Sequence, residues 1–375
     1  MARLPRRAAL ALLAAAGCGG GGASGDGGGG DGDGGGGAPP AFPVGEHQWS
    51  WIPVDGSRCM DGSATGIGVD LDFSSDRLLI LFEGGGACFD DASCGSAAHQ
   101  DGFGEGQLAS FAARAGERGI FDRADRANPA TAWSFVLVPY CSGDAHAGAT
   151  EDGVGGRVQV GFENAGRAAT AVAAAMDGRL SRVLLAGQSA GGFGALYNHD
   201  QVQRIFGAVP VDLLDDSGPA PPDAIFRPCL QEIFRESWNM AATAPADCAA
   251  CSGPDGGGLV NLVPFLADKY AGRRFGLVTS LSDRTNRQVF GSGYPDCENP
   301  AGLVPADPFA AGMAELRDVV MAPLANAAAY TIDSDEHVWT ARPLGDTTVG
   351  GVSLGSWIAD LASGAPGWDA VAPPQ

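Results

Sequence analysis

The segment VLLAGQSAGGFG, residues 183–194, decides the fold. Its four leading apolar residues predict a buried strand, and Gly187 and Gly191 flank Ser189 in the pattern G-x-S-x-G. In this pattern the serine lies on a sharp turn between a strand and a helix. The turn crowds the two flanking positions, so they must lack a Cβ atom. Because an amphipathic run follows over 192–206, we interpret the segment as a nucleophile elbow rather than a glycine-rich turn.

Short apolar runs alternate with helical patterns along the rest of the chain. The expected strands are 78–82, 135–138, 183–186, 206–211, 275–279 and 328–332, and the expected helices are 164–176, 192–205, 309–320 and 354–361. Strands that are apolar on both faces and alternate with helices predict an α/β fold with a mainly parallel sheet between two helix layers. No linker interrupts residues 41–375, which predicts one domain. Residues 213–270 break the rhythm and predict an insertion, either a cleft wall or a disulfide-stapled surface loop.

The first 40 residues do not fit the pattern of a packed domain. Three arginines precede a short apolar run over 8–16, which is typical of a signal peptide, here residues 1–17. The run ends at Cys18 in a sequence that resembles the lipobox of bacterial lipoproteins, where the cysteine is lipidated. Ordinary cleavage after Ala16 is the alternative. Residues 18–40 are mostly glycine and predict a flexible tether between a lipid anchor and the domain.

Nine cysteines are present, and eight remain when Cys18 is set aside. An even number of cysteines in an exported chain predicts disulfide bonds. The spacing of Cys248 and Cys251 also fits a zinc ligand pair, but no second pair lies at a suitable distance. The spacing alone leaves the pairing open.

The formal net charge of the 375-residue chain is −21. Binding to a phosphate backbone requires a basic face, so nucleic acid is excluded as a partner class. A highly anionic polymer is disfavoured as a substrate for the same reason.

A serine nucleophile needs a histidine base, and His337 is the best of the five histidines. It follows an expected strand near the C-terminus, where the base comes in Ser-Asp-His chain order. His199 lies ten residues after Ser189 on the expected helix, which carries it away from the elbow. The three other histidines precede the elbow in the chain.

The acid that orients the base should follow a strand between Ser189 and His337. Asp283 comes directly after the expected strand 275–279 and is the leading candidate. The alternatives are Asp296 in the same loop and the acids next to the histidine, which are Asp333, Asp335 and Glu336.

Oxyanion donors are expected from the backbone N–H of Ala190, the residue after the nucleophile, and from a glycine-rich turn after an early strand. Residues 84–87, which read GGGA, directly follow the strand 78–82 and supply that turn. Glycines let the backbone come close to a substrate without obstruction by side chains.

Four blocks of sequence together resemble the pectin acetylesterase and Notum family. They are EGGGAC at 83–88, PYCSGD at 139–144 with Gly148, GQSAGGFGA at 187–195 with Asp200, and Asp283 with Gln288, followed by His337. The resemblance implies an α/β-hydrolase fold, ester hydrolysis without a metal or cofactor, and a Ser189, Asp283 and His337 triad. It also implies oxyanion donors at Gly85, Gly86 and Ala190.

Two positions depart from that family pattern. Ala87 stands where the family often has an aromatic residue, which should widen or reshape the acyl pocket. His146 stands in a loop where relatives have other residues, and it faces either the cleft or solvent.

The sequence thus predicts an exported serine carboxylesterase that deacetylates an acetylated polysaccharide and touches the membrane only through its lipid anchor. A lipase-like carboxylesterase for longer acyl groups and a catalytically silent surface-binding lipoprotein are the alternatives.

Overall fold

The computed structural model describes residues 42–374. The expected signal peptide over 1–17, the lipidation site Cys18 and the tether over 18–40 lie outside the described residues. Within 42–374 no helix is long and apolar enough to cross a bilayer.

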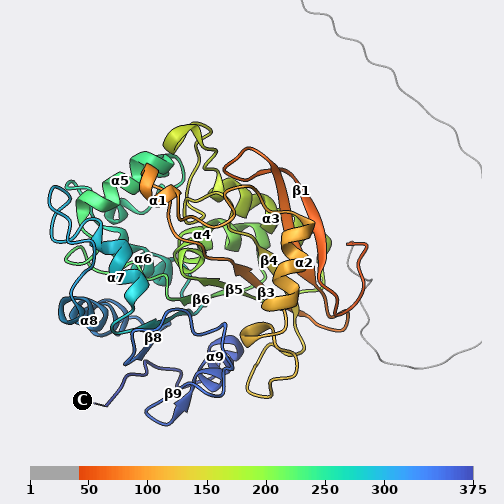
Figure 1. Ribbon diagram of the computed structural model, residues 1–375. Helices are drawn as coiled ribbons and strands as arrows, with labels where there is room; N and C mark the ends of the chain where they lie inside the picture. Colours follow the sequence, from red (N-terminus) through yellow and green to blue (C-terminus); the bar gives the residue numbers. More distant parts are fainter. Residues whose placement is uncertain (1–41, 375) are drawn as a thin grey trace, which may run out of the picture. The chain divides into compact units, whose positions relative to one another are not determined.

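A mixed sheet of eight strands forms the centre of the described chain (Figure 1). Its strands in chain order are β1 (Ser50–Arg58), β2 (Ala64–Asp70), β3 (Arg77–Phe82), β4 (Ser134–Val138), β5 (Arg182–Gln188), β6 (Val211–Asp216), β7 (Phe275–Ser280) and β8 (Ala327–Ile332). Their spatial order is β1-β2-β4-β3-β5-β6-β7-β8. The pairs β1·β2 and β2·β4 are antiparallel, and all later pairs are parallel. A short antiparallel pair, β9 (Thr348–Val349) and β10 (Val352–Ser353), precedes the last helix.

Helices cover both faces of the sheet (Figure 1). They are α1 (Asp91–Cys94), α2 (Glu105–Arg114), α3 (Gly161–Ala175), α4 (Ala190–Phe206), α5 (Pro228–Trp238), α6 (Leu262–Lys269), α7 (Arg284–Gly291), α8 (Ala306–Glu315) and α9 (Leu354–Ser363). Alternate residues of β3 enter different cores, as the two-residue period of a strand requires. Leu78, Ile80 and Phe82 pack with α3 and α4, whereas Leu79 and Leu81 pack with α2 and α9. The predicted two-sided, mainly parallel α/β sheet is confirmed.

The structure corrects the prediction around residues 206–216. We expected a strand over 206–211 and an insertion from 213 onward, but α4 extends to Phe206 and β6 spans Val211–Asp216. The pattern was misleading because three carboxylates interrupt an otherwise apolar strand. One of them, Asp212, accepts a hydrogen bond from the backbone N–H of Arg274 and pairs with Arg182. The insertion therefore begins after β6, and it ends with α6 as part of the crossover to β7.

The eight cysteines after Cys18 form four disulfide bonds, which confirms the disulfide prediction. The pairs are Cys59–Cys141, Cys88–Cys94, Cys229–Cys297 and Cys248–Cys251. The alternative zinc assignment for Cys248 and Cys251 is therefore wrong, because both sulfurs are consumed in one bridge. Cys229–Cys297 joins α5 of the insertion to the loop after α7.

Candidate active site

Ser189 lies on the expected sharp turn between β5 and α4. Its backbone has φ 58° and ψ −125°, a conformation that non-glycine residues rarely adopt. The carbonyl of Asp216 accepts the Ser189 N–H at 2.7 Å and so fixes the turn to β6. A Cβ atom on Gly187 would collide with the carbonyl of Gly191, and one on Gly191 would collide with the carbonyl of Phe82. The local packing thus explains why glycine flanks the serine at both positions.

Asp283 and His337 meet at the carboxyl end of the sheet. The His337 Nδ1 atom lies 2.7 Å from Asp283 Oδ2, and because a carboxylate accepts, Nδ1–H is the donor. Asp283 is 0% exposed and also caps α7 by accepting the backbone N–H of Asn286 at 2.9 Å. The Nε2 atom of His337 is buried and has no hydrogen-bond partner within residues 42–374. One nitrogen of the ring is therefore anchored and the other is available.

The loop that carries His337 is held by Asp216, which the sequence reasoning missed. Its side-chain oxygens accept hydrogen bonds from the backbone N–H groups of Trp339 and Thr340, at 2.9 and 2.6 Å, and from the Thr340 hydroxyl at 2.6 Å. Full burial raises the pKa of Asp216 above its ordinary value, although these donors oppose the shift. A pair of aspartates ending an apolar strand was the signal that could have revealed this role.

Within residues 42–374, none of the rival acids forms a hydrogen bond or an ion pair with the His337 side chain. Asp296 is exposed and accepts backbone N–H groups in its own loop. Glu336 pairs with Arg342, and Asp333 and Asp335 are exposed. The structure therefore brings His337 together with Asp283 alone among the candidate carboxylates.

The glycine loop after β3 presents unpaired backbone donors. Within the described chain, the N–H groups of Gly85, Gly86 and Ala190 donate no hydrogen bond to another protein group. Gly86 has φ +84°, the left-handed region that favours glycine. A Cβ atom on Gly84 would lie 2.8 Å from the Ser189 Cβ, so the loop and the elbow are in close contact.

A cavity of about 70 Å³ lies against Ser189. Its lining is mainly apolar and comes from the glycine loop, the elbow, the insertion and α7: Gly86, Ala87, Ala145, Ser189, Ala190, Phe193, Gly218, Pro219, Phe226, Phe234, Thr285, Asn286, Val289 and Phe290. Ala87 lines this cavity. The insertion contributes Phe226 and Phe234, so it forms part of the wall.

The remaining histidines have other partners. His146 is buried, and its Nε2 atom lies 2.9 Å from the carbonyl of Glu83 at the start of the glycine loop. His199 is buried on α4 against the carbonyl of Val211, and His99 pairs with the Glu83 carboxylate. His146 therefore does not lie in solvent, and its backbone neighbour Ala145 is the residue that lines the cavity.

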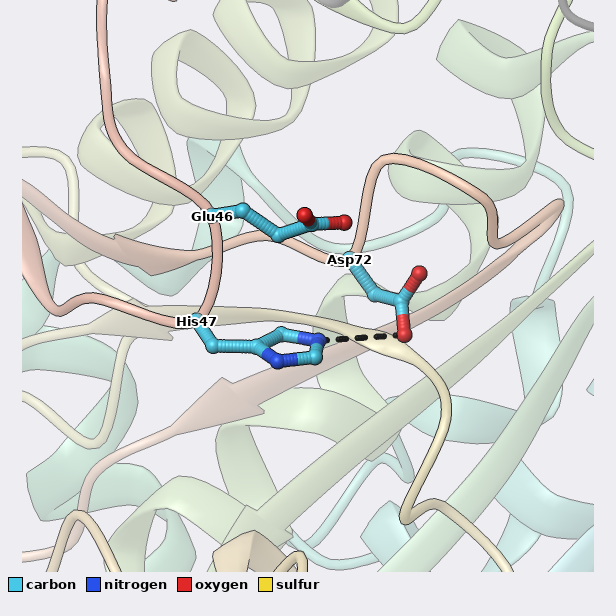
Figure 2. Close-up of side chains that lie close together, drawn as sticks. All are labelled: Glu46, His47 and Asp72. Carbon is cyan, nitrogen blue, oxygen red and sulfur yellow. Dashed lines mark hydrogen bonds and ion pairs between the residues drawn. The ribbon is translucent and has the colours of Figure 1, made fainter.

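One cluster of potential metal ligands is found in the described part of the chain (Figure 2). It consists of the side chains of Glu46, His47 and Asp72, which lie close enough together to hold a metal ion. Their ligand atoms lie within 4.8 Å of one another, and Figure 2 shows the His47 ring directed at the Asp72 carboxylate. Asp72 precedes β3, whereas the glycine loop next to Ser189 follows β3. The length of this strand therefore separates the potential metal ligands from Ser189. His47 Nε2 bonds Asp72 at 3.1 Å and Glu46 accepts the Phe73 N–H, which ties the first described segment to the domain.

The sheet order and the strained serine on the turn after β5 are those of an α/β-hydrolase fold. A family model described as pectinacetylesterase matches residues 52–252, more than half of the chain. The protein therefore belongs to the pectinacetylesterase family, and this membership supports carboxylester hydrolysis. A search of curated proteins found no match.

Solved structures of Notum from Drosophila, described as a Wnt deacylase, are similar in fold. One crystal form superposes with a TM-score of 0.61 at 19% identity and covers 84% of this chain and 92% of the Notum chain. A second crystal form gives a TM-score of 0.59 at 20% identity, with 83% and 92% coverage. The likeness extends over most of both chains and confirms the expected α/β-hydrolase fold.

Proposed function

We propose that this protein is an exported serine carboxylesterase that removes acetyl groups from an acetylated polysaccharide. The observation that carries the proposal is the buried hydrogen bond between Asp283 and His337 at the same sheet edge as a strained serine. A histidine with one nitrogen anchored to a carboxylate and the other unpaired is the arrangement that a serine nucleophile requires.

In the proposed mechanism, Ser189 attacks the carbonyl carbon of the ester while His337 Nε2 accepts the hydroxyl proton. The backbone N–H groups of Gly85, Gly86 and Ala190 stabilise the negative charge that develops on the carbonyl oxygen. His337 then donates the proton to the leaving alcohol, and an acyl-Ser189 ester remains. Water, deprotonated by the same histidine, releases the carboxylic acid. Asp283 keeps the imidazole in the Nδ1–H tautomer throughout and stabilises its charged form.

The cavity volume supports a short acyl group. A dry protein cavity of about 150 Å³ can hold benzene, which has six carbons. By this scale a cavity of about 70 Å³ accommodates roughly three carbons. Acetyl to butyryl groups therefore fit beyond the carbonyl carbon. Family membership adds the acetylated polysaccharide as the expected alcohol component.

A second candidate is a carboxylesterase for longer acyl groups. The observation that favours it is the apolar wall, to which the insertion contributes Phe226 and Phe234 and α7 contributes Phe290. Ala87 also leaves space where the family often has an aromatic ring. Small rearrangements of these side chains would extend the cavity along the acyl chain.

Export rests on the sequence of the N-terminal 40 residues, with the four disulfides as support. We propose that residues 1–17 are removed and that Cys18 carries the lipid. In a bacterial expression host, Cys18→Ser is then expected to move the protein from the membrane fraction to the soluble fraction. Unchanged fractionation would rule out the lipid anchor.

The enzyme proposal is tested by labelling and by a substrate panel. A fluorophosphonate probe is expected to label the wild-type protein and not Ser189→Ala, and only the wild type should release acetate from acetylated pectin, xylan or chitin fragments. Equal labelling of both proteins would refute Ser189 as the nucleophile. A wild type that neither reacts with the probe nor hydrolyses any ester would support the catalytically silent lipoprotein.

A further inference from the structure

The carbonyl groups of the glycine loop are held by three different segments. The bonds are His146 Nε2 to the Glu83 carbonyl at 2.9 Å, Ala98 N–H to the Gly85 carbonyl at 2.8 Å, and the Tyr140 hydroxyl to the Gly86 carbonyl at 2.7 Å. A trans peptide unit is planar, so fixing a carbonyl also fixes the N–H of the next residue in the opposite direction. The bond to the Gly85 carbonyl therefore sets the direction of the unpaired Gly86 N–H, and the bonds to Glu83 and Gly86 fix the first and last peptide units of the loop.

The loop needs such anchors because its residues are glycines. Gly86 has a positive φ, and neither it nor Gly84 and Gly85 has a side chain that restricts the backbone. The Glu83–Gly84 peptide is the first unit beyond β3, so its orientation determines where the rest of the loop begins. His146 is the side chain that holds this first unit.

His146 connects the glycine loop to the helix that carries the elbow. Its side chain is buried, with 1% of the residue exposed, and its ring lies 4.8 Å from Phe82 and 5.1 Å from Tyr140, measured between centroids. Its own carbonyl accepts a hydrogen bond at 2.7 Å from Asn198 on α4. A backbone carbonyl can only accept, so Nε2–H is the donor to Glu83. Burial lowers the pKa of His146 to about 4, which keeps the ring neutral near pH 7.

The backbone at this point is strained. Ala145 has φ 50° and His146 has φ 56°, so two successive non-glycine residues lie in the left-handed region, which L-residues with a side chain disfavour. The strained turn brings the Ala145 N–H within 2.9 Å of the Tyr140 hydroxyl, which in turn holds Gly86. Strain of this kind persists only where the surroundings fix it, and it is concentrated at functional sites.

We propose that His146 is a positioning residue for the oxyanion loop. Its Nε2–H donor fixes the Glu83–Gly84 peptide, and the strained turn that it shares with Ala145 aligns Tyr140 with Gly86. Together they hold the N–H groups of the glycine loop toward the ester at Ser189. This inference rests on the proposed esterase function.

Three variants separate hydrogen bonding from simple packing. His146→Phe keeps a buried ring and removes the donor, whereas His146→Gln keeps an N–H donor at a similar reach. His199→Phe is the matched control. His199 is also fully buried, also bonds a backbone carbonyl through Nε2, at 2.8 Å from Val211, and also has a pKa of about 4. Its carbonyl partner belongs to β6 rather than to the glycine loop.

Removal of an oxyanion donor costs about 100- to 1,000-fold in kcat, so loss of alignment should cost less. With an aryl acetate as substrate, we expect His146→Phe to lower kcat about 10- to 100-fold with little change in KM. His146→Gln should stay within about five-fold of the wild type, and His199→Phe within about two-fold. The inference is overturned if His146→Phe retains wild-type kcat, if His199→Phe loses as much activity, or if His146→Gln is as impaired as His146→Phe.

Amide hydrogen exchange at Ala98, whose N–H donates to the Gly85 carbonyl of the loop, provides a readout that does not depend on activity. We expect faster exchange there in His146→Phe than in the wild type or in His199→Phe, because the loop loses its first anchor. Unchanged exchange would overturn the inference even in an active enzyme. Faster exchange in His146→Phe, together with a wild type that has no esterase activity, would instead support the positioning role and refute the proposed function.

Discussion

The size of the cavity next to Ser189 leads to a quantitative prediction about acyl length. If about 150 Å³ holds six carbons, each carbon needs roughly 25 Å³. The cavity of about 70 Å³ then holds about three carbons, which are those of butyrate beyond its carbonyl. Each buried methylene contributes about 0.8 kcal/mol, so two extra methylenes should favour butyrate over acetate by about ten-fold in kcat/KM.

Two variants change this volume in opposite directions. Ala87→Val adds two carbons at the wall, about 50 Å³, and leaves room for about one carbon. Val289 on α7 also lines the cavity. Val289→Ala removes two carbons there and leaves room for about five carbons. We expect the first variant to lose the ten-fold preference for butyrate while retaining acetate hydrolysis. The second should shift the optimum toward hexanoate.

The assay is steady-state hydrolysis of p-nitrophenyl esters from acetate to octanoate. Val319→Ala is the control, because Val319 is 65% exposed and lies on the segment after α8 rather than at the cavity. A wild type with its optimum at octanoate would refute the short-chain assignment and favour the second candidate function. If Ala87→Val leaves the butyrate-to-acetate ratio unchanged, the acyl group does not enter this cavity.

Three further predictions concern the acid, a disulfide and pH. Asp283→Asn should lower kcat about 10,000-fold, because an amide favours the wrong histidine tautomer. The control Asp296→Asn, at an exposed position, should retain kcat. Equal activity of the two variants would exclude Asp283 as the acid that orients His337. Replacing Cys229 and Cys297 by serine should lower the free energy of unfolding by about 4 kcal/mol in a denaturant titration. The reason is that the bridge closes a loop of 68 residues and so restricts the entropy of the unfolded chain. An unchanged free energy of unfolding would contradict this argument. Burial lowers the pKa of His199 from 6.5 to about 4, so its contribution to stability is present above pH 6.5 and lost as the pH falls toward 4. The loss should be about 3 kcal/mol, and His199→Phe should make the unfolding free energy correspondingly less sensitive to acid.

The sequence predicted the parts of the fold that follow from local pattern. The elbow, the buried parallel strands and the helices after them have strong periodic signals, and Asp283 and His337 each follow a strand, which placed them at one sheet edge. Their catalytic roles stay predictions. The antiparallel strands β1 and β2 were missed because neither contains a continuous apolar run. β1 is mostly exposed or half-buried and includes Pro53, and β2 is buried but is interrupted by Gly66 and Gly68.

Long-range partners could not be predicted from spacing. The disulfide pairs join residues up to 82 positions apart, and eight cysteines allow about a hundred pairings. The position of β6 was shifted because Asp212, Asp215 and Asp216 make a fully buried strand look polar. The burial of His146 was likewise invisible, because its partner is a backbone carbonyl and carries no sequence signal.

These failures share a physical cause that also explains how the site is held. Asp216 and His146 are buried polar side chains whose desolvation is offset by hydrogen bonds to the backbone of irregular loops. The loops that carry His337 and the oxyanion donors have no helix or sheet ladder of their own to fix them. Local pattern rules therefore fail at the residues that fix the site, as is expected where function overrides propensity. At Asp216 and His146, a substitution that keeps the hydrogen bond should therefore be tolerated better than one that keeps only the shape of the side chain. In an apolar core the opposite holds, because shape and volume decide which substitutions are tolerated.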